Sequence, residues 1–215
     1  MQTQKTSLAG FGCKGIMPVM RLSTLIIPGW QDSGPGHWQT QWEQSLPHAR
    51  RVVQPDWLTP DPATWHATVA QAVGAADRPV LLIAHSLGCL AVAALPFPLH
   101  AKVAGALLVA PADVERPNAA SVIAAFAPVP RQPLSFQTVV VGSNNDPYCS
   151  AERARSFAES WGSRLEVVAG GGHINAEAGF GCWPQGLRLL TSLRRRSTWR
   201  VQPPPAKVAC LPERR

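Results

Sequence analysis

Short runs of almost wholly apolar residues recur along this chain, and a segment with helical spacing separates each run from the next. Strands that are apolar on both faces must be buried on both faces, which is typical of a parallel sheet covered by helices on either side. The sequence therefore predicts an α/β fold with a mostly parallel sheet. The expected strands are 22–28, 51–54, 79–84, 105–110, 136–142 and 164–169, and the expected helices are 36–46, 63–75, 87–95, 118–126, 151–161 and 184–194.

The length of 215 residues fits one domain of this kind with additional residues at its ends. The formal net charge of +7 belongs to those ends, because residues 22–193 hold 10 basic against 12 acidic side chains. No basic surface of the kind that binds nucleic acid is therefore expected on the domain. We expect 1–21 to be a flexible N-terminal extension, and 194–215 to be a basic, proline-rich and flexible C-terminal tail.

The five cysteines are scattered and form no CxxC pair, so neither a disulfide framework nor a zinc site is expected. The first residues lack the apolar segment of a secretory signal, and the predicted location is the cytoplasm. Residues 79–99 are apolar enough to imitate a membrane span, but Gly88 and Pro96 divide them into strand, turn and helix. No glycine-rich loop fits a dinucleotide, and no spacing of His, Cys and carboxylates suggests a metal, so we expect no cofactor.

The segment Ala84-His85-Ser86-Leu87-Gly88 stands between the most apolar strand candidate and a helix of small residues. A nucleophile elbow has this form, because the strand must stop abruptly and small neighbours must let the backbone fold back tightly. The hydroxyl of Ser86 is then exposed, and the amide of Leu87 at the helix start can stabilise a negative oxygen. Ala84 stands where glycine is more usual, so some backbone strain is expected. The alternative is an ordinary turn in which Ser86 caps the helix.

A nucleophilic serine needs a base within hydrogen-bond reach and an acid that orients the base. In a doubly wound hydrolase these groups follow in the order Ser, Asp, His, each in a loop after a later strand. Asp146 directly follows one strand candidate, and His173 follows the next behind three glycines. Because the carboxyl ends of parallel strands share one edge of the sheet, Ser86, Asp146 and His173 are the candidate catalytic residues. Asp113 is a competing acid, and Asp146 is also typical of a turn before proline.

The loop after the first strand is the expected source of a second oxyanion donor. Gly29 permits close approach of the backbone, so the amide of Trp30 would join that of Leu87 in an oxyanion hole. His37 begins the next helix close to this loop and is a candidate substrate-pocket residue.

Other aromatic side chains are expected to serve the structure. Trp38 and Trp42 share one helix face, which favours a place in the core over a substrate cage. His85 neighbours the nucleophile, but successive side chains diverge at an elbow, so we expect it to pack behind the site. No partner pattern surrounds the remaining histidines, which we expect at the surface: His48, His66 and His100.

Taken together, these segments resemble the small bacterial α/β-hydrolases that are similar to the mammalian retinoblastoma-binding serine hydrolase. The resemblance covers about 22–193 and implies a compact α/β-hydrolase domain with no large lid, a triad of Ser86, Asp146 and His173, and no cofactor. The matching pieces are IIPGWQDSGPGHWQTQWE (26–43), QPDW (54–57), AHSLG (84–88), LVAPAD (108–113), SNNDPYCS (143–150) and GGHINAEAGFGCWPQG (171–186).

The chain is thus predicted to be a serine hydrolase that cleaves small ester, thioester or amide substrates through an acyl-enzyme on Ser86. The 111–135 connection leaves little room for a cap, so a shallow pocket that prefers small acyl groups is expected. Its apolar rim is expected to come from Trp30 and Leu87, with Tyr148 or Phe180 as further candidates.

One competing hypothesis is an interaction module that keeps the fold with little or no catalysis, as relatives that bind regulatory proteins make conceivable. A complete set of nucleophile, base and acid argues against it, because a pure binder needs none of them. A second competing hypothesis is another α/β-hydrolase reaction such as dehalogenation, which needs a carboxylate at position 86, so Ser86 argues against it. The partner expected is a small acyl substrate; no nucleic acid, membrane span or particular protein partner is indicated.

Overall fold

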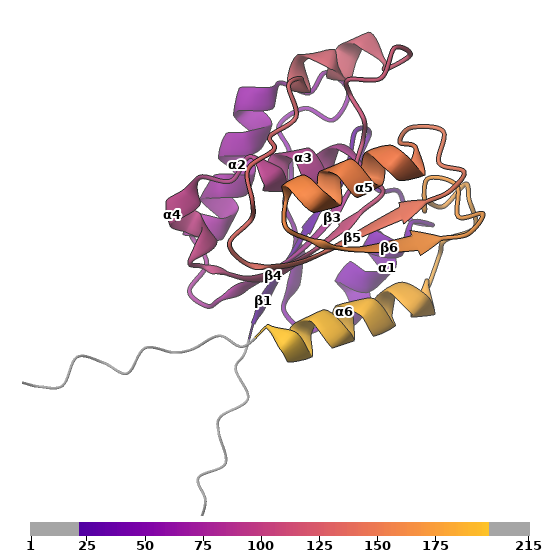
Figure 1. Ribbon diagram of the computed structural model, residues 1–215. Coiled ribbons are helices and arrows are strands. Elements are labelled where there is room, and N and C mark those ends of the chain that lie inside the picture. The colour runs from indigo at the N-terminus through magenta and orange to yellow at the C-terminus, as the bar shows by residue number, and fades with distance from the viewer. Residues whose placement is uncertain (1–21, 198–215) are drawn as a thin grey trace, which may run out of the picture.

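The computed structural model describes residues 22–197, which form a six-stranded sheet between two layers of helices (Figure 1). The strand order is β2-β1-β3-β4-β5-β6, and every neighbouring pair is parallel. The predicted fold class is therefore confirmed. The strands are β1 Ser23–Ile27, β2 Ala49–Arg51, β3 Val80–His85, β4 Val103–Val109, β5 Gln137–Ser143 and β6 Arg164–Val168. The helices are α1 Trp38–Ser45, α2 Pro62–Gly74, α3 Leu87–Ala93, α4 Phe97–His100, α5 Ala151–Ser160, α6 Pro184–Arg196 and the 3₁₀ helix η1 Ser121–Phe126.

Two apolar cores lie on opposite faces of the sheet. Helices α2, α3 and α5 cover one face, and α1 and α6 cover the other (Figure 1). Because side chains alternate along a strand, Leu82 and Ala84 of β3 enter the first core while Leu81 and Ile83 enter the second. Every residue of β3 is buried, which explains why its sequence is a continuous apolar run rather than an alternating one.

Three indole rings anchor the segment that follows His173. Trp38 and Trp42 of α1 are buried and pack against Trp183, and the Trp42 and Trp183 rings are stacked with centroids 5.6 Å apart. The Nε1 of Trp38 donates to the carbonyl of Ile174 at 2.8 Å, and that of Trp42 donates to Cys182 at 3.1 Å. The expectation that Trp38 and Trp42 belong to the core is confirmed, and the core here fixes a loop at the carboxyl edge of the sheet.

Several element boundaries differ from those expected. The edge strand β2 covers Ala49–Arg51 rather than 51–54. The N–H of Val52 still donates to the carbonyl oxygen of Ile26 in β1, and beyond that bond the chain turns away from the sheet. The helix expected at 118–126 is a 3₁₀ helix confined to Ser121–Phe126. The short helix α4 was not predicted, and it begins after Pro96, which separates it from α3.

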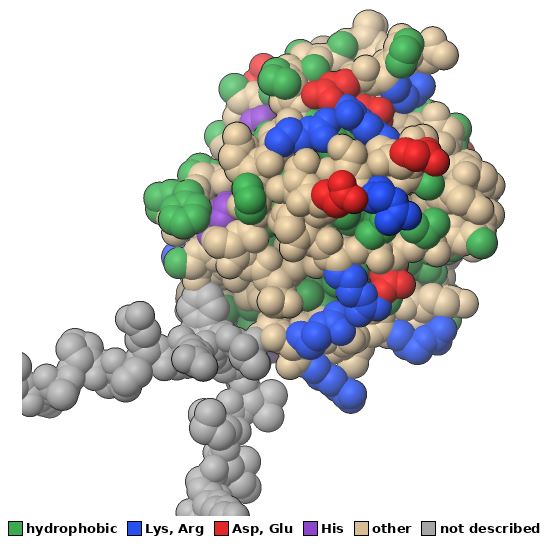
Figure 2. Space-filling view, in the orientation of Figure 1, with side chains coloured by type: hydrophobic (Ala, Val, Ile, Leu, Met, Phe, Trp, Pro, Cys, Tyr) green, Lys and Arg blue, Asp and Glu red, His purple; other side chains and the backbone are tan. Residues whose placement is uncertain are grey.

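The helix α6 continues to Arg196, so residues 194–196, which were predicted to belong to the flexible C-terminal tail, form its last turn instead. The predicted N-terminal extension, 1–21, and the remainder of the predicted tail, from 198, lie outside the described residues. The last turn of α6 carries three arginines, Arg194, Arg195 and Arg196. Figure 2 shows basic side chains at this end of the molecule, whereas acidic and basic side chains lie beside one another elsewhere on the face it presents.

Within residues 22–197, no helix has both the length and the apolar character needed to cross a membrane. The apolar segment 79–99 forms β3, the turn at Ser86 and α3. Three cysteines in the described range are free thiols, namely Cys89, Cys149 and Cys182.

Candidate active site

The turn between β3 and α3 holds Ser86 in a strained conformation. Its φ of 52° and ψ of −123° lie in a region that side-chain-bearing residues rarely adopt, and such strain is characteristic of functional turns. The turn needs glycine at 88, because a Cβ there would stand 2.4 Å from the carbonyl oxygen of Pro28. Ala84, which stands where glycine is more usual, keeps regular strand register with Ile27 and Leu108.

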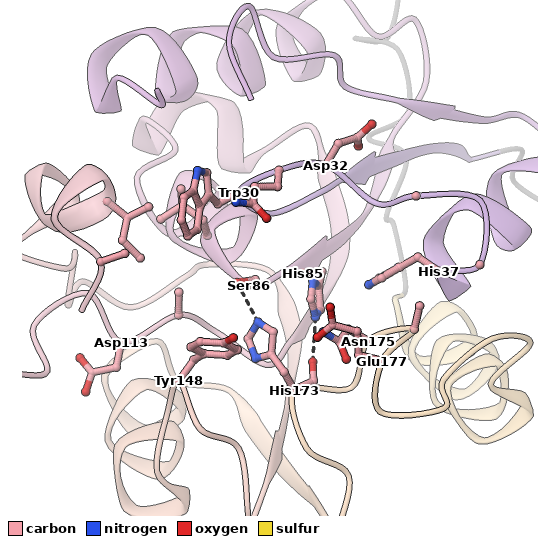
Figure 3. A pocket seen from close by; sticks show the side chains of 18 of the residues that line it. Trp30, Asp32, His37, His85, Ser86, Asp113, Tyr148, His173, Asn175 and Glu177 are labelled. Carbon is pink, nitrogen blue, oxygen red and sulfur yellow. Dashed lines mark hydrogen bonds between the residues drawn. The ribbon is translucent and has the colours of Figure 1, made fainter. Parts of the chain in front are cut away.

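The three predicted catalytic side chains form one hydrogen-bonded row. The Nδ1 of His173 lies 2.9 Å from Oδ2 and 3.1 Å from Oδ1 of Asp146, so the carboxylate favours a proton on Nδ1. The Nε2 is then an acceptor, and it lies 3.0 Å from the Oγ of Ser86 (Figure 3). The Asp146 side chain is 1% exposed and that of His173 is 10% exposed, so bulk water is nearly excluded from the contact between carboxylate and imidazole.

Two asparagines tie the loop that carries Asp146 to the loop that carries His173. The Oδ1 of Asn144 accepts from the N–H of Gly170 at 2.8 Å, and that of Asn145 accepts from Gly172 at 2.7 Å. Both glycines have positive φ, 66° and 52°, which glycine adopts without steric cost. The asparagines were not singled out from the sequence, where the run Ser-Asn-Asn-Asp is typical only of a turn.

His85 packs against the His173 ring, as expected, but it also lines the cavity over Ser86, which the sequence did not indicate. It is 5% exposed, and its Nε2 lies 2.9 Å from the carbonyl oxygen of His173, to which it donates (Figure 3). Burial, with smaller contributions from His173 and His37, lowers the pKa of His85 well below its ordinary value. The ring is therefore neutral at neutral pH, and it joins the elbow to the backbone of His173.

Trp30 and Leu87, the predicted oxyanion donors, approach Ser86 from two segments. Leu87 begins α3, and neither its N–H nor that of Trp30 donates a hydrogen bond to another described residue. Gly29 brings the Trp30 segment close, because a Cβ at Gly29 would stand 2.7 Å from Cβ of Ser86 and 3.3 Å from the Leu87 nitrogen.

The buried side chain of Gln39 holds the loop between β1 and α1 in place. Its Nε2 donates to the carbonyl oxygens of Ile27 at 3.2 Å and of Ile83 at 3.1 Å, and its Oε1 accepts from Ser33. Nothing in the sequence distinguished this glutamine from the solvent-exposed polar residues of an amphipathic helix.

A cavity of about 370 Å³ opens over Ser86 (Figure 3). Trp30, Leu87 and Tyr148 line it as expected, and the Tyr148 ring packs against that of His173 with centroids 4.6 Å apart. His37 lines the cavity on another side. Phe180, the fourth candidate for the rim, does not line it, because it packs against Trp183 on the α6 side of the sheet.

The competing acid Asp113 lines the cavity but lies outside the catalytic row, and the remaining histidines lie away from the site. Asp113 is paired with Arg153 at 3.1 Å and makes no hydrogen bond to His173. The expectation of a surface position is wrong for His100, which is 8% exposed and bonds to the Leu95 carbonyl and the Ser135 hydroxyl. His66 is half-buried against Phe126, and His48 is exposed.

The chain is similar to known hydrolases in sequence and in fold. A family model described as serine hydrolase matches residues 24–192. Among solved structures, a protein described as a YdeN-like hydrolase from Pectobacterium atrosepticum is 36% identical with a TM-score of 0.73, covering 82% of this chain and 92% of that one. A search among curated proteins finds no match.

Two more distant structures share the fold. The ydeN gene product of B. subtilis is 20% identical with a TM-score of 0.66, and the match covers 82% of this chain and 100% of that one. Est1E from Butyrivibrio proteoclasticus, solved with ferulic acid bound, is 14% identical with a TM-score of 0.59, covering 83% and 88% of the two chains. At these identities the likeness concerns the fold alone.

Proposed function

Because the chain belongs to the serine hydrolase family, we propose that it cleaves small ester, thioester or amide substrates through an acyl-enzyme on Ser86. The observation that carries this proposal is the row from Asp146 through His173 to Ser86, with contacts of 2.9 and 3.0 Å, at the floor of an open cavity. Such a row is what a serine needs to become a nucleophile at neutral pH.

In the acylation step, the Oγ of Ser86 attacks the substrate carbonyl carbon while its proton passes to Nε2 of His173. Asp146 keeps the other proton on Nδ1 and stabilises the imidazolium that forms. The tetrahedral intermediate collapses, and the alcohol, thiol or amine departs with the proton from Nε2. Water then attacks the acyl-enzyme with His173 again as base, which releases the acid and restores the Ser86 hydroxyl.

The amides of Trp30 and Leu87 would hold the negative oxygen of each tetrahedral intermediate. Both are free donors beside Ser86, as the close approach of Gly29 indicates. Donors placed in advance stabilise charge that develops only in the transition state, an effect of about 3–4 kcal/mol for one donor in comparable sites.

The size of the cavity favours small acyl groups. A volume of about 370 Å³ lies near the lower end of ligand pockets, which run from roughly 300 to 1,000 Å³. We expect kcat/KM to be higher for an aryl butyrate than for the matching aryl dodecanoate. Faster turnover of the long-chain ester would contradict the proposed size preference while leaving the chemistry intact.

Labelling with a fluorophosphonate, which reacts with activated serines, tests the proposed nucleophile. The wild-type chain should be labelled, and Ser86→Ala should not be. Ser45→Ala serves as the matched control, because the Ser45 hydroxyl is exposed and bonds only to the Gln41 carbonyl. Undiminished labelling of Ser86→Ala would remove Ser86 from this role, and absence of labelling in the folded wild-type chain would favour an interaction module.

We also propose that the enzyme works in the cytoplasm. The three described cysteines are free, and Cys182 is exposed, where a reducing compartment preserves it as a thiol.

A further inference from the structure

The cavity contains a buried hydrogen-bond donor that the proposed mechanism does not use. His37 is the N-cap of α1, and its Nδ1 accepts a hydrogen bond from the N–H of Gln39 at 3.1 Å. The residue is 6% exposed, and its Nε2 has no hydrogen-bond partner among the described residues. Buried polar atoms are rarely left in this state, so an unpaired one beside a cavity calls for an explanation.

The protonation of His37 follows from its surroundings. Burial, and then the positive charge of Arg51, lowers the pKa of His37 to about 4, so the ring is neutral at neutral pH. Because Nδ1 is the acceptor for Gln39, the single proton of the neutral ring lies on Nε2. His37 therefore offers an N–H group that can donate to an oxygen and cannot accept from a donor.

The position of His37 relates it to the reacting atoms. The rings of Tyr148, His173, His85 and His37 follow one another with centroids 4.6, 4.8 and 4.8 Å apart. His173 must give its proton to the leaving group, which could lie on either side of its ring. The Tyr148 end is open to solvent, since Tyr148 is 43% exposed against 5% for His85 and 6% for His37, so we assign the departing group to the Tyr148 end. The acyl group then extends the other way, past His85 toward His37, whose ring is directed toward His85 in Figure 3.

We propose that the Nε2–H of His37 binds an oxygen on the acyl group, and that the preferred substrates are esters or thioesters of short hydroxy or oxo acids. This inference rests on the proposed hydrolase function and specifies its substrate class. A plain alkyl acyl group would leave the donor unpaired, and an ammonium group has no lone pair to offer it. Glu177, an exposed carboxylate, lines the cavity beside His85 (Figure 3), whereas the cation Arg116 lies over Tyr148, with its Cζ 5.5 Å from the ring centroid, at the opposite end. The charge near His37 therefore disfavours an anionic acyl group and leaves a neutral hydroxyl or ketone as the acceptor.

Paired substrates that differ by one oxygen test the proposal. The 4-nitrophenyl esters of butyrate and of 3-hydroxybutyrate have the same leaving group and chain length, so their kcat/KM ratio isolates the hydroxyl. We expect the wild-type chain to prefer the hydroxy ester by about tenfold or more. His37→Asn keeps an N-cap acceptor for Gln39 but removes the Nε2 donor, and the preference should fall to less than about threefold.

Two controls make the outcome specific. His66→Asn removes another buried Nε2 that lacks a partner, away from the cavity, and should leave the substrate ratio unchanged. A second pair, 2-hydroxyethyl butyrate and propyl butyrate, moves the oxygen to the alcohol half. Preference for the hydroxyl in this second pair alone would overturn the assignment of the His37 side to the acyl group.

The inference and the proposed function fail in different ways. Equal rates on the two aryl esters in the wild-type chain, or an unchanged preference in a folded His37→Asn variant, would overturn the role of His37 while butyrate hydrolysis and fluorophosphonate labelling continue. Loss of the proposed function would instead appear as hydrolysis that survives Ser86→Ala. If His37→Asn does not fold, His37→Ser supplies the same comparison, since serine is also a strong N-cap.

Discussion

Removing the side chain of Asn145 tests whether the tie between the two catalytic loops matters for the reaction. Asn145→Ala deletes the acceptor that bonds the N–H of Gly172 at 2.7 Å and the hydroxyl of Ser143 at 2.8 Å. Gly172 immediately precedes His173, so the loss falls on the loop that positions the base. The substitution does not touch the cavity, which Asn145 does not line.

The size of the effect follows from the two lost hydrogen bonds. A typical hydrogen bond contributes about 0.5–1.5 kcal/mol, and Asn145 is exposed, so the lower half of that range applies to each bond. The bond from Gly172 holds the His173 loop directly, and the bond from Ser143 fixes the Asn145 amide that accepts it, so the two contribute about 1–2 kcal/mol together. If this free energy separates the catalytically competent conformation of the His173 loop from its other conformations, losing it lowers kcat by about 5- to 30-fold.

Steady-state kinetics with an aryl butyrate, together with thermal unfolding, measures this effect. We expect kcat to fall while KM changes by less than about threefold, because the cavity is intact. Asn118→Ala is the matched control, since Asn118 is exposed and makes no side-chain hydrogen bond to a described residue, and it should match wild type. An Asn145→Ala enzyme with wild-type kcat and an unchanged melting temperature would refute the claim that this tie positions His173.

Three further predictions concern the acid, a buried histidine and the elbow. Asp146→Asn should lower kcat by about 10⁴-fold, because the amide favours the wrong tautomer of the base, and should be measured against Ser86→Ala to define the background. His37 is buried in its neutral form, and its pKa is about 4 in the folded chain against about 6.5 in the unfolded chain. Its contribution to the free energy of unfolding is therefore fully present above pH 6.5 and is lost as the pH falls toward 4. Urea unfolding at pH 7 and 5 should show about 2 kcal/mol of loss from this group, absent in His37→Asn, and equal losses in the two proteins would contradict it. Gly88→Ala should destabilise the fold by about 2–3 kcal/mol in urea, because its Cβ would lie 2.4 Å from the carbonyl oxygen of Pro28; wild-type stability would refute the close packing of the elbow.

The features that the sequence predicted correctly are those that depend on local patterns of residues. The buried strands were recognisable because burial on both faces requires continuous apolar runs, as in β3. The places of Ser86, Asp146 and His173 followed from the rule that loops after parallel strands meet at one edge of the sheet. No local pattern places Asp113 against Arg153, so sequence alone left it open as a competing acid.

The features that escaped prediction depend on contacts between distant segments. The amide of Asn145 bonds a backbone N–H that is 27 residues away in the sequence, and His85 bonds a carbonyl 88 residues away. Phe180 was expected at the rim of the cavity, but it packs against Trp183 in the core beneath α1 and α6. His100 lacks any local sign of burial, and its partners, Leu95 and Ser135, are set by tertiary packing.

The central claim, that Ser86 becomes acylated during turnover, is tested most directly by rapid quenching with 4-nitrophenyl butyrate followed by peptide mass spectrometry. We predict a burst of nitrophenolate equal to the enzyme concentration, and a butyryl group on the peptide that contains Ser86. A butyryl group on another side chain, or steady turnover by Ser86→Ala at the wild-type rate, would contradict the account.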